Sequence, residues 1–293
     1  MNDDRRFERN LGFLTYEEQE KISNATVSIA GAGGDGGMLA IGLARIGVGE
    51  IRLADPDLFE IENVNRQAAC NEQTIGVNKA EAVGSVIREI NPDIKLQIYD
   101  EGINQDSVDE FVQGSNLVID ETEFTKHVIA VMLARTARSH DTPNLTAMNI
   151  GFGALVTTFH PSGKTVEKIL GLDENAPLDE IAEQEVALSR WLPYIPDYAD
   201  LKAFAVVSKG EKPAPSIYPG VSMASAIATT QSMLNIVGKS NRRHSPIYAP
   251  KALVMDGMTY DSKITTFSRR NHYRHLSKVL LRNVLKLNPH TSY

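Results

Sequence analysis

Cysteine is almost missing from this chain of 293 residues, and its scarcity excludes two kinds of site. The one thiol, Cys70, cannot form an internal disulfide framework or supply the cysteine pairs of a structural zinc site. Because residues 95–293 hold no cysteine, no catalytic thiol is expected there. Free cysteines are usually small buried hydrophobic residues, and the alanines before Cys70 favour that interpretation over a nucleophile.

Excess basic charge and long apolar runs are also lacking. The formal net charge is −7, so no surplus of lysine and arginine is available to neutralise nucleic-acid phosphates. The chain has no run of about 18 apolar residues and no apolar core near its start, which argues against a membrane span or a secretion signal. A cytoplasmic protein is expected. The 42% of hydrophobic residues suffice for a substantial core.

The first half of the sequence alternates between two kinds of apolar pattern. Strands are expected at residues 26–31, 50–55, 95–100 and 116–121, with one or two more within 144–160. Helices are expected at residues 35–46, 78–94, 107–114 and 125–140. This alternation predicts an α/β fold, Rossmann-like, with a mostly parallel sheet and helices on both faces.

The character of the chain changes at residue 161. Residues 161–216 are polar, acidic at 173–185 and broken by prolines, and they predict an excursion with short helices. The acidic stretch is either a lid or docking surface for a basic partner, or a solvated helical face. A helix at 218–238, two antiparallel strands within 251–268 and a last helix at 275–285 follow. We expect one domain over 1–293, divided into a nucleotide-binding half (1–160), the excursion (161–216) and a C-terminal part (217–293).

A glycine-rich turn, "GAGGDGG" at residues 31–37, separates the first strand from the first helix, and Asp55 ends the next strand. By spacing this is a dinucleotide fingerprint, in which the turn holds phosphates and the acid holds a ribose. The glycines alone do not distinguish NAD, FAD and ATP. Arg66 and Lys79 favour ATP, because cleavage of its α–β bond needs cations over the triphosphate and hydride transfer does not. A NAD- or FAD-dependent oxidoreductase is the alternative.

The runs "GAGGDGG", "ADPD", "ENVNRQ", "GVNKAEA" and "INPDI" together resemble the adenylating enzymes related to ThiF, MoeB and the ubiquitin-activating enzymes. The resemblance implies an ATP- and Mg²⁺-dependent enzyme, usually a homodimer, that converts a carboxylate into an acyl-adenylate. That carboxylate is expected on a peptide or ubiquitin-like protein, at its C-terminus or on a side chain. Natural-product maturation and sulfur-carrier or cofactor biosynthesis are the expected contexts.

The resemblance also implies roles for individual residues. Arg66 and Lys79 are the expected catalytic cations, and Arg9, in a segment "RFERNLGFL" similar to the family's N-terminus, acts in trans on a partner subunit. The expected nucleotide-binding residues are Gly31, Gly33, Gly34, Asp55, Asp57, Asn63, Arg66, Gln67 and Lys79.

The sequence departs from the family at two places. The family's "D-x-T-D-N" motif reads Asp120-Glu121-Thr122-Glu123-Phe124, so Mg²⁺ is expected on Glu123 with help from Asp120. Without cysteines after residue 95 no zinc and no enzyme thioester are expected, and His272 and His275 are more often surface residues than ligands. A non-catalytic relative that lost metal binding through Glu123 and Phe124 is a further alternative.

Overall fold

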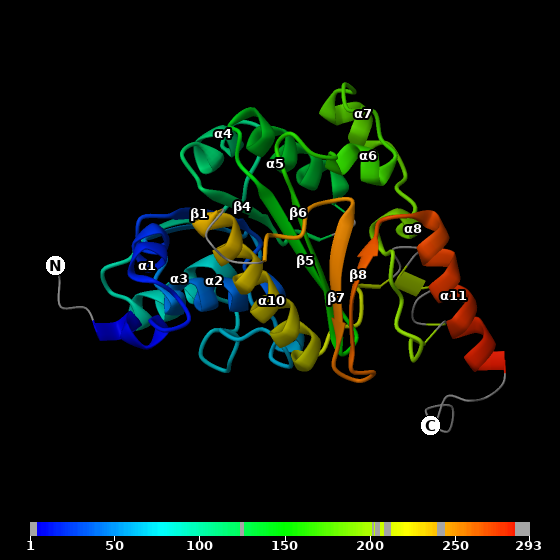
Figure 1. Cartoon of the computed structure of the whole chain (residues 1–293), viewed down its shortest axis with the longest axis horizontal. Coiled ribbons are helices and arrows are strands. Elements are labelled where there is room, and N and C mark those ends of the chain that lie inside the picture. The colour runs from blue at the N-terminus through cyan, green and yellow to red at the C-terminus, as the bar shows by residue number, and fades with distance from the viewer. Residues whose placement is uncertain are drawn as a thin grey trace.

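The computed structural model describes residues 5–123, 126–200, 202, 206–207, 212–238 and 244–284. Within them, eight strands form one sheet in the order β3-β2-β1-β4-β5-β6-β7-β8 (Figure 1). The strands are β1 (Thr26–Ala30), β2 (Glu50–Ala54), β3 (Lys95–Tyr99), β4 (Leu117–Asp120), β5 (Asn144–Ile150), β6 (Gly153–Phe159), β7 (Lys251–Asp256) and β8 (Asp261–Thr266). Strands β3, β2, β1, β4 and β5 run parallel, and β5 to β8 pair antiparallel, as predicted.

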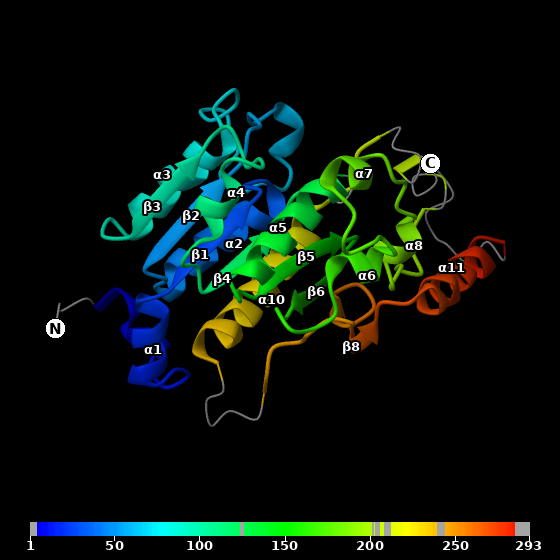
Figure 2. The ribbon, with the colours of Figure 1, turned by 90° about the horizontal axis from the view of Figure 1, so that it is seen from above.

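Helices cover both faces of the parallel part, which Figure 2 shows from above. Val27 and Ile29 of β1 face one way, into a core shared with α2 (Gly34–Ile46), α3 (Lys79–Ile90) and α10 (Tyr218–Val237). Ala30 faces the other way, into a core shared with α4 (Val108–Val112) and α5 (His127–Ser139). Alternate residues of a buried strand point to opposite faces, so a continuous apolar run such as "TVSIA" serves both cores.

The excursion adds a further hydrophobic core beside the sheet. Its described part includes the short helices α6 (Val166–Leu170), α7 (Leu178–Ala182) and α8 (Leu188–Trp191). Ile169, Ile181 and Trp191 are buried there against α5, β6 and β7, while the acidic side chains of α7 stay exposed. The excursion, although polar in sequence, therefore packs several apolar side chains into a core. These residues are widely spaced in the sequence, so they give no clear periodic signal.

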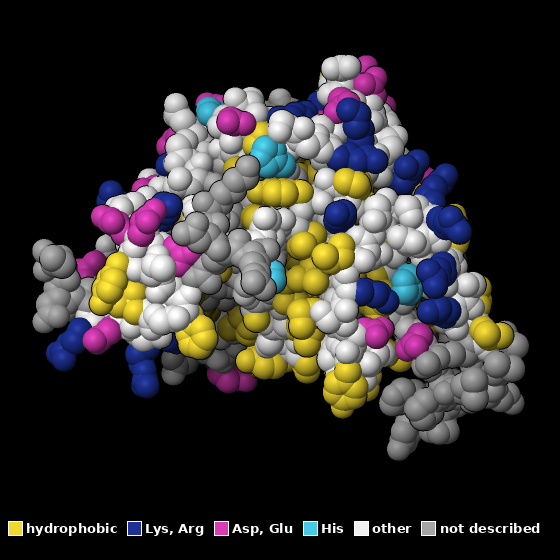
Figure 3. Space-filling view, in the orientation of Figure 1, with side chains coloured by type: hydrophobic (Ala, Val, Ile, Leu, Met, Phe, Trp, Pro, Cys, Tyr) yellow, Lys and Arg dark blue, Asp and Glu magenta, His cyan; other side chains and the backbone are white. Residues whose placement is uncertain are grey.

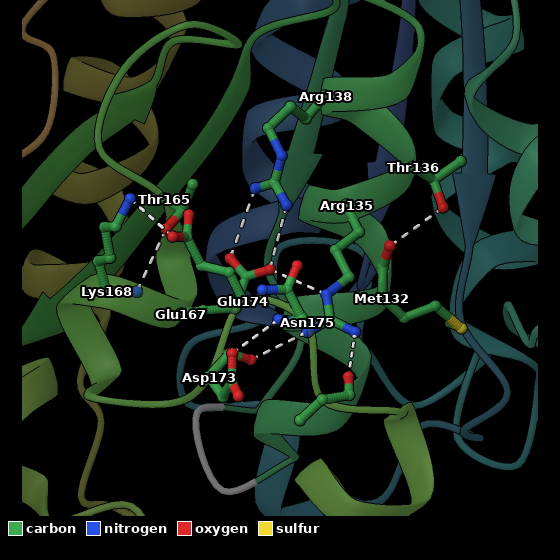
Figure 4. Close-up of polar contacts among 11 residues, drawn as sticks. Met132, Arg135, Thr136, Arg138, Thr165, Glu167, Lys168, Asp173, Glu174 and Asn175 are labelled. Atoms are coloured by element: carbon green, nitrogen blue, oxygen red, sulfur yellow. Dashed lines mark hydrogen bonds and ion pairs between the residues drawn. The ribbon is translucent and has the colours of Figure 1, made fainter.

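A buried ion-pair cluster fastens the excursion to α5 (Figure 4). Glu167 of α6 has no exposed side-chain surface. Its carboxylate accepts hydrogen bonds from Arg135 (2.9 Å) and Arg138 (3.2 Å). Arg135 also donates to the carbonyl oxygens of Ala176 (2.7 Å) and Asp173 (3.2 Å). One guanidinium therefore neutralises a buried charge and satisfies backbone acceptors of the excursion.

Near the ends of the chain, one helix was not predicted from the sequence and another begins earlier than predicted. Helix α1 (Tyr16–Ser23) begins with a capping box in which Thr15 and Glu18 bond to each other's backbone N–H, a local signal that predicts a helix start. Helix α11 (Arg269–Val284) begins at Arg269 rather than at residue 275, because the Ser268 hydroxyl accepts from the Asn271 N–H.

The surface beside β8 and α11 is basic (Figure 3). Basic side chains gather over β8 and α11 (Figure 3), where Lys263, Arg274 and Lys278 line a cavity of about 300 Å³. This end of the sheet is separated from β1 by β4 to β7. No helix in the described part of the chain is both long and apolar enough to cross a membrane.

Candidate functional site

The glycine-rich turn connects β1 to α2 at the carboxyl ends of the parallel strands. Gly31 has φ +102°, and a Cβ there would lie 2.4 Å from the Glu121 carbonyl oxygen. A Cβ on Gly36 would lie 2.0 Å from the Gly31 carbonyl oxygen. Both positions therefore need glycine, which brings the first turn of α2 against the strand ends. No side chain caps α2, so its first N–H groups are available to an anion.

Arg66 and Gln67 reach this turn from a loop far along the chain. A Cβ built on Gly33 would lie 3.8 Å from the Gln67 side chain, and one built on Gly34 would lie 4.0 Å from Cγ of Arg66. Val221, in the first turn of α10, packs on Gly34 from the same open side. The structure thus brings together the predicted glycines and two of the predicted side chains.

Asn63 shapes the turn that carries Arg66. It ends the 3₁₀ helix η2 (Ile61–Asn63), and its side-chain oxygen accepts from the Glu60 N–H (3.0 Å). The Asn63 carbonyl oxygen accepts from the N–H groups of Arg66 (3.1 Å) and Gln67 (2.9 Å). The predicted phosphate ligand Asn63 is therefore buried and engaged in local structure, and it places Arg66 through the backbone.

Asp55 and Lys79 lie on the other side of the turn. The Asp55 carboxylate accepts from the N–H groups of Ala32 (2.7 Å) and Asp57 (2.9 Å), and burial raises its pKa. Each carboxylate oxygen keeps a lone pair for a further donor such as a ribose hydroxyl. Lys79, at the start of α3, pairs through Nζ with the Asp57 carboxylate (3.0 Å). The Asp57 carboxylate is thus paired with Lys79 and holds its ammonium group in place.

The two predicted metal ligands differ in burial. Asp120, at the end of β4, is buried; its Oδ1 accepts from the N–H (3.1 Å) and hydroxyl (2.7 Å) of Thr122, and burial raises its pKa. Glu123 is exposed, and Phe124 lies outside the described residues. Mg²⁺ is usually held through one or two carboxylates with phosphate oxygens and water, and one oxygen of Asp120 is not used by the Thr122 bonds. Among the described residues no cluster of three or more acids, histidines or cysteines could hold a metal by itself.

Two further acids were not predicted as site residues: Asp35, within the glycine turn itself, and Glu121, which packs against Gly31 and Gly36. Strand β5 extends beyond Thr146, where its pairing with β4 ends, and its free N–H groups donate to these acids. The Ala147 N–H donates to Glu121 (3.0 Å), and the N–H (2.9 Å) and side-chain amide (2.8 Å) of Asn149 donate to Asp35.

Both of these acids hold protons more tightly than usual. Burial raises the pKa of Asp35 to about 7, although the Asn149 bonds and the Arg66 charge oppose the rise. Burial, reinforced by the neighbouring charge of Asp35, raises the pKa of Glu121 well above its ordinary value. For Asp35 the sequence did carry a signal, namely an acid inside a glycine-rich motif, because a residue at such a position lies at the start of a helix.

Arg9 does not reach the glycine turn of its own chain. It lies in the 3₁₀ helix η1 (Arg5–Asn10), whose Phe7 packs on Gly47 beyond the C-terminal end of α2. Helix α2 has 13 residues, which corresponds to a length of about 20 Å. A role of Arg9 in catalysis therefore requires a second subunit, and it stays a prediction.

The cysteine and the histidines are engaged in packing. Cys70 is buried, its Sγ lies 3.5 Å from the Glu60 carbonyl oxygen, and burial raises its pKa. His272 is buried with Nδ1 2.7 Å from the Leu192 carbonyl oxygen, so its expected surface position is wrong. His275 packs on the Tyr194 ring, and burial lowers its pKa to about 4. Apolar contacts of α11 with the excursion bury these rings, which local sequence does not reveal.

Curated relatives share part of this chain. The SAMP-activating enzyme E1 of Haloferax volcanii is 33% identical over 107 residues, which are 36% of this chain and 40% of that enzyme. The tRNA threonylcarbamoyladenosine dehydratase of Bacillus subtilis is 32% identical over 143 residues, 48% of this chain and 56% of the enzyme. The adenylyltransferase and sulfurtransferase UBA4 of Candida albicans is 30% identical over 129 residues, 42% of this chain and 30% of the relative. The chain therefore spans less than two thirds of each.

Solved structures share the fold over most of the chain. E. coli MccB with ATP superposes with a TM-score of 0.67 at 20% identity, covering 91% of this chain and 73% of that one. PaaA superposes with a TM-score of 0.64 at 18% identity, covering 89% and 72%. The ThiF family model matches residues 7–276, and the chain therefore belongs to the ThiF family.

Proposed function

We propose that this protein transfers the adenylyl group of ATP to a carboxylate of a peptide or small ubiquitin-like protein and releases pyrophosphate. The observation that carries the proposal is the position of Arg66 beside Gly34, at the uncapped start of α2, together with the charge of Lys79 near Asp55, which accepts from the Ala32 N–H of the same turn. Cations and helix N–H groups gathered near one turn suit a triphosphate. Two of the relatives are named as adenylyltransferase or activating enzyme, and MccB has been solved with ATP and with N-formylated MccA.

The reaction needs charge stabilisation more than acid or base groups. A carboxylate oxygen of the substrate attacks the α-phosphorus, the bond to the β-phosphate oxygen breaks, and pyrophosphate leaves with the electron pair. Arg66 and Lys79 stabilise the charge that moves onto pyrophosphate. Asp55 binds the ribose. The α-phosphate lies against the N–H groups at Gly33 and Gly34.

Two features of this proposal depend on groups outside the chain. Asp120 and Glu123 hold Mg²⁺, which supplies Lewis-acid neutralisation of the phosphates when bound. Arg9 of a second copy completes the cation set, so the active form is a homodimer. The cytoplasmic location stays a prediction alongside these two.

The adenylate passes to its acceptor without an enzyme thioester. Cys70 is the one cysteine of these 293 residues, and its thiol is buried with a raised pKa, which disfavours the thiolate. An amine, a sulfur donor or a group on the substrate itself is the nucleophile in this proposal.

Exchange of labelled pyrophosphate into ATP tests the activity. The substrates are synthetic peptides, one ending in Gly-Gly and one with a blocked C-terminus and a free side-chain carboxylate. We expect peptide-dependent exchange that falls about 100-fold in Arg66→Ala and in Lys79→Ala, because each variant removes a cation from the developing charge. Arg88→Ala and Lys95→Ala, which change exposed side chains of α3 and β3, are the matched controls and retain full exchange. Absence of ATP binding, or full exchange in both site variants, contradicts the proposal.

A further inference from the structure

Asn149, at the free end of β5, uses its side chain in two directions. Its amide nitrogen donates to Asp35 in the first turn of α2 (2.8 Å), and its amide oxygen accepts from the Ser216 hydroxyl (2.8 Å). These two contacts determine the orientation of the side-chain amide, and the backbone N–H of Asn149 donates to the same Asp35 oxygen (2.9 Å). Asn149 therefore joins the glycine turn to the last residue of the excursion.

The connection continues from Ser216 to Arg66. The Ser216 carbonyl oxygen accepts from the side-chain amide nitrogen of Asn65 (3.1 Å). The Asn65 side-chain oxygen in turn accepts from the Arg66 guanidinium (2.8 Å). With its nitrogen engaged by Ser216, the Asn65 amide must present its oxygen to Arg66. A continuous path of hydrogen bonds thus runs from Asp35 through Asn149, Ser216 and Asn65 to Arg66.

The start of α10 is held against the same turn. The Ser225 hydroxyl of α10 donates to the Asp35 carbonyl oxygen (3.0 Å), and Val221 packs on Gly34. Ser216 lies just before Ile217, the N-cap residue of α10, so its position is tied to this helix. The guanidinium of Arg66 has only one other recorded acceptor among the described residues, the Glu62 carbonyl oxygen (3.0 Å).

We propose that Asn149 and Ser216 are positioning residues, which hold the guanidinium of Arg66 beside the glycine turn and so strengthen its hold on ATP. The inference rests on the proposed function, since it assigns Arg66 to the triphosphate.

The test measures ATP affinity by isothermal titration in single and double variants. We expect Ser216→Ala to weaken ATP binding about tenfold, because the hydroxyl bond that fixes the Ser216 carbonyl is lost. Ser216→Thr keeps the hydroxyl and binds ATP within about twofold of the parent. In the Arg66→Ala background, Ser216→Ala changes the affinity no further, since it acts through the missing guanidinium. In exchange assays Ser216→Ala raises KM for ATP more than it lowers kcat.

Controls separate this role from general destabilisation. Ser139→Ala removes an exposed hydroxyl that bonds only within α5, and it leaves ATP affinity unchanged. Asn149→Ala is a second variant, with folding checked by thermal denaturation, and it weakens ATP binding at least as much as Ser216→Ala. The inference is overturned if Ser216→Ala behaves like Ser139→Ala, or if its effect persists undiminished without Arg66. Failure of the parent protein to bind ATP overturns the proposed function itself, and the inference with it.

Discussion

Two buried carboxylates, Glu167 in the excursion and Asp35 in the glycine turn, are held in opposite ways. Both oxygens of Glu167 face guanidinium groups, those of Arg135 and Arg138 (Figure 4). Asp35 has no cation within hydrogen-bond reach among the described residues; one of its oxygens accepts both Asn149 bonds, and Oδ1 is buried without a recorded partner. Glu167 is therefore part of the scaffold, whereas Asp35 at the site is not paired with a cation in this way, and burial raises its pKa.

The paired carboxylate of Glu167 contributes to stability, whereas the partly paired carboxylate of Asp35 lies at the candidate site. A fully paired buried charge fastens an irregular segment to a helix and is costly to disrupt. A partly paired acid next to a nucleotide turn is tolerated because it holds a proton, and it makes local behaviour depend on pH. Buried carboxylates thus fasten the excursion to α5 and make the glycine turn sensitive to pH.

The largest expected effect is on the Glu167 cluster. Arg135→Ala leaves the buried carboxylate with Arg138 alone and removes the donor from two backbone carbonyls. We expect the free energy of unfolding to fall by about 3 kcal/mol or more, measured by urea denaturation. Arg138→Ala is the matched comparison; this side chain is 31% exposed and its loss costs about 1 kcal/mol. Equal losses in the two variants would show that Arg135 has no special role.

A smaller effect is expected at Asp35, with a definite pH dependence. The pKa is raised from 3.8 to about 7 in the folded state, so the folded chain binds this proton more tightly than the unfolded chain. Stability therefore falls as pH rises from about 4 to about 7, and above that the whole cost is present. Asp35→Asn removes the charge but leaves a buried amide in its place, so it recovers only part of the cost, about 1–2 kcal/mol at pH 8 and none at pH 4. Urea denaturation across this range checks it, and parallel profiles for the two proteins would falsify the raised pKa.

The smallest effect is expected at Cys70, which tests whether a buried thiol takes part in chemistry. Cys70→Ala should retain peptide-dependent exchange within about twofold and lose about 1 kcal/mol of stability, because only a small buried side chain is trimmed. The exchange assay and thermal denaturation measure both. Abolished turnover of the adenylate with normal exchange would instead assign the thiol a role after adenylation.

Local patterns were sufficient for most elements and for part of the site. β1, α2 and β2 follow from a β-branched run, a glycine turn and a second apolar run that are adjacent in sequence. Arg66 and Gln67 were expected near the turn and lie there. The start of α11 and the whole of α1 were missed because their caps at Ser268 and Thr15 were overlooked, although both caps are local signals.

Other features depend on segments that meet only in the folded chain. Asp35 and Asn149 are 114 positions apart, and their contact exists because β5 continues past the end of β4. The burial of His272 against the Leu192 carbonyl joins α11 to the excursion. The length of neighbouring strands decides the first contact and the packing of α11 decides the second, and no periodicity in one segment contains either.

The sequence by itself determined the alternation of strands and helices from β1 to β5 and the glycine turn between β1 and α2, because each of these patterns lies in adjacent residues. The tertiary structure alone decided which acids are neutralised and which keep a proton, and how Ser216 meets Asn65 across 151 positions. The physical reason is that desolvation and hydrogen-bond partnership are properties of packed surroundings, which distant segments create together.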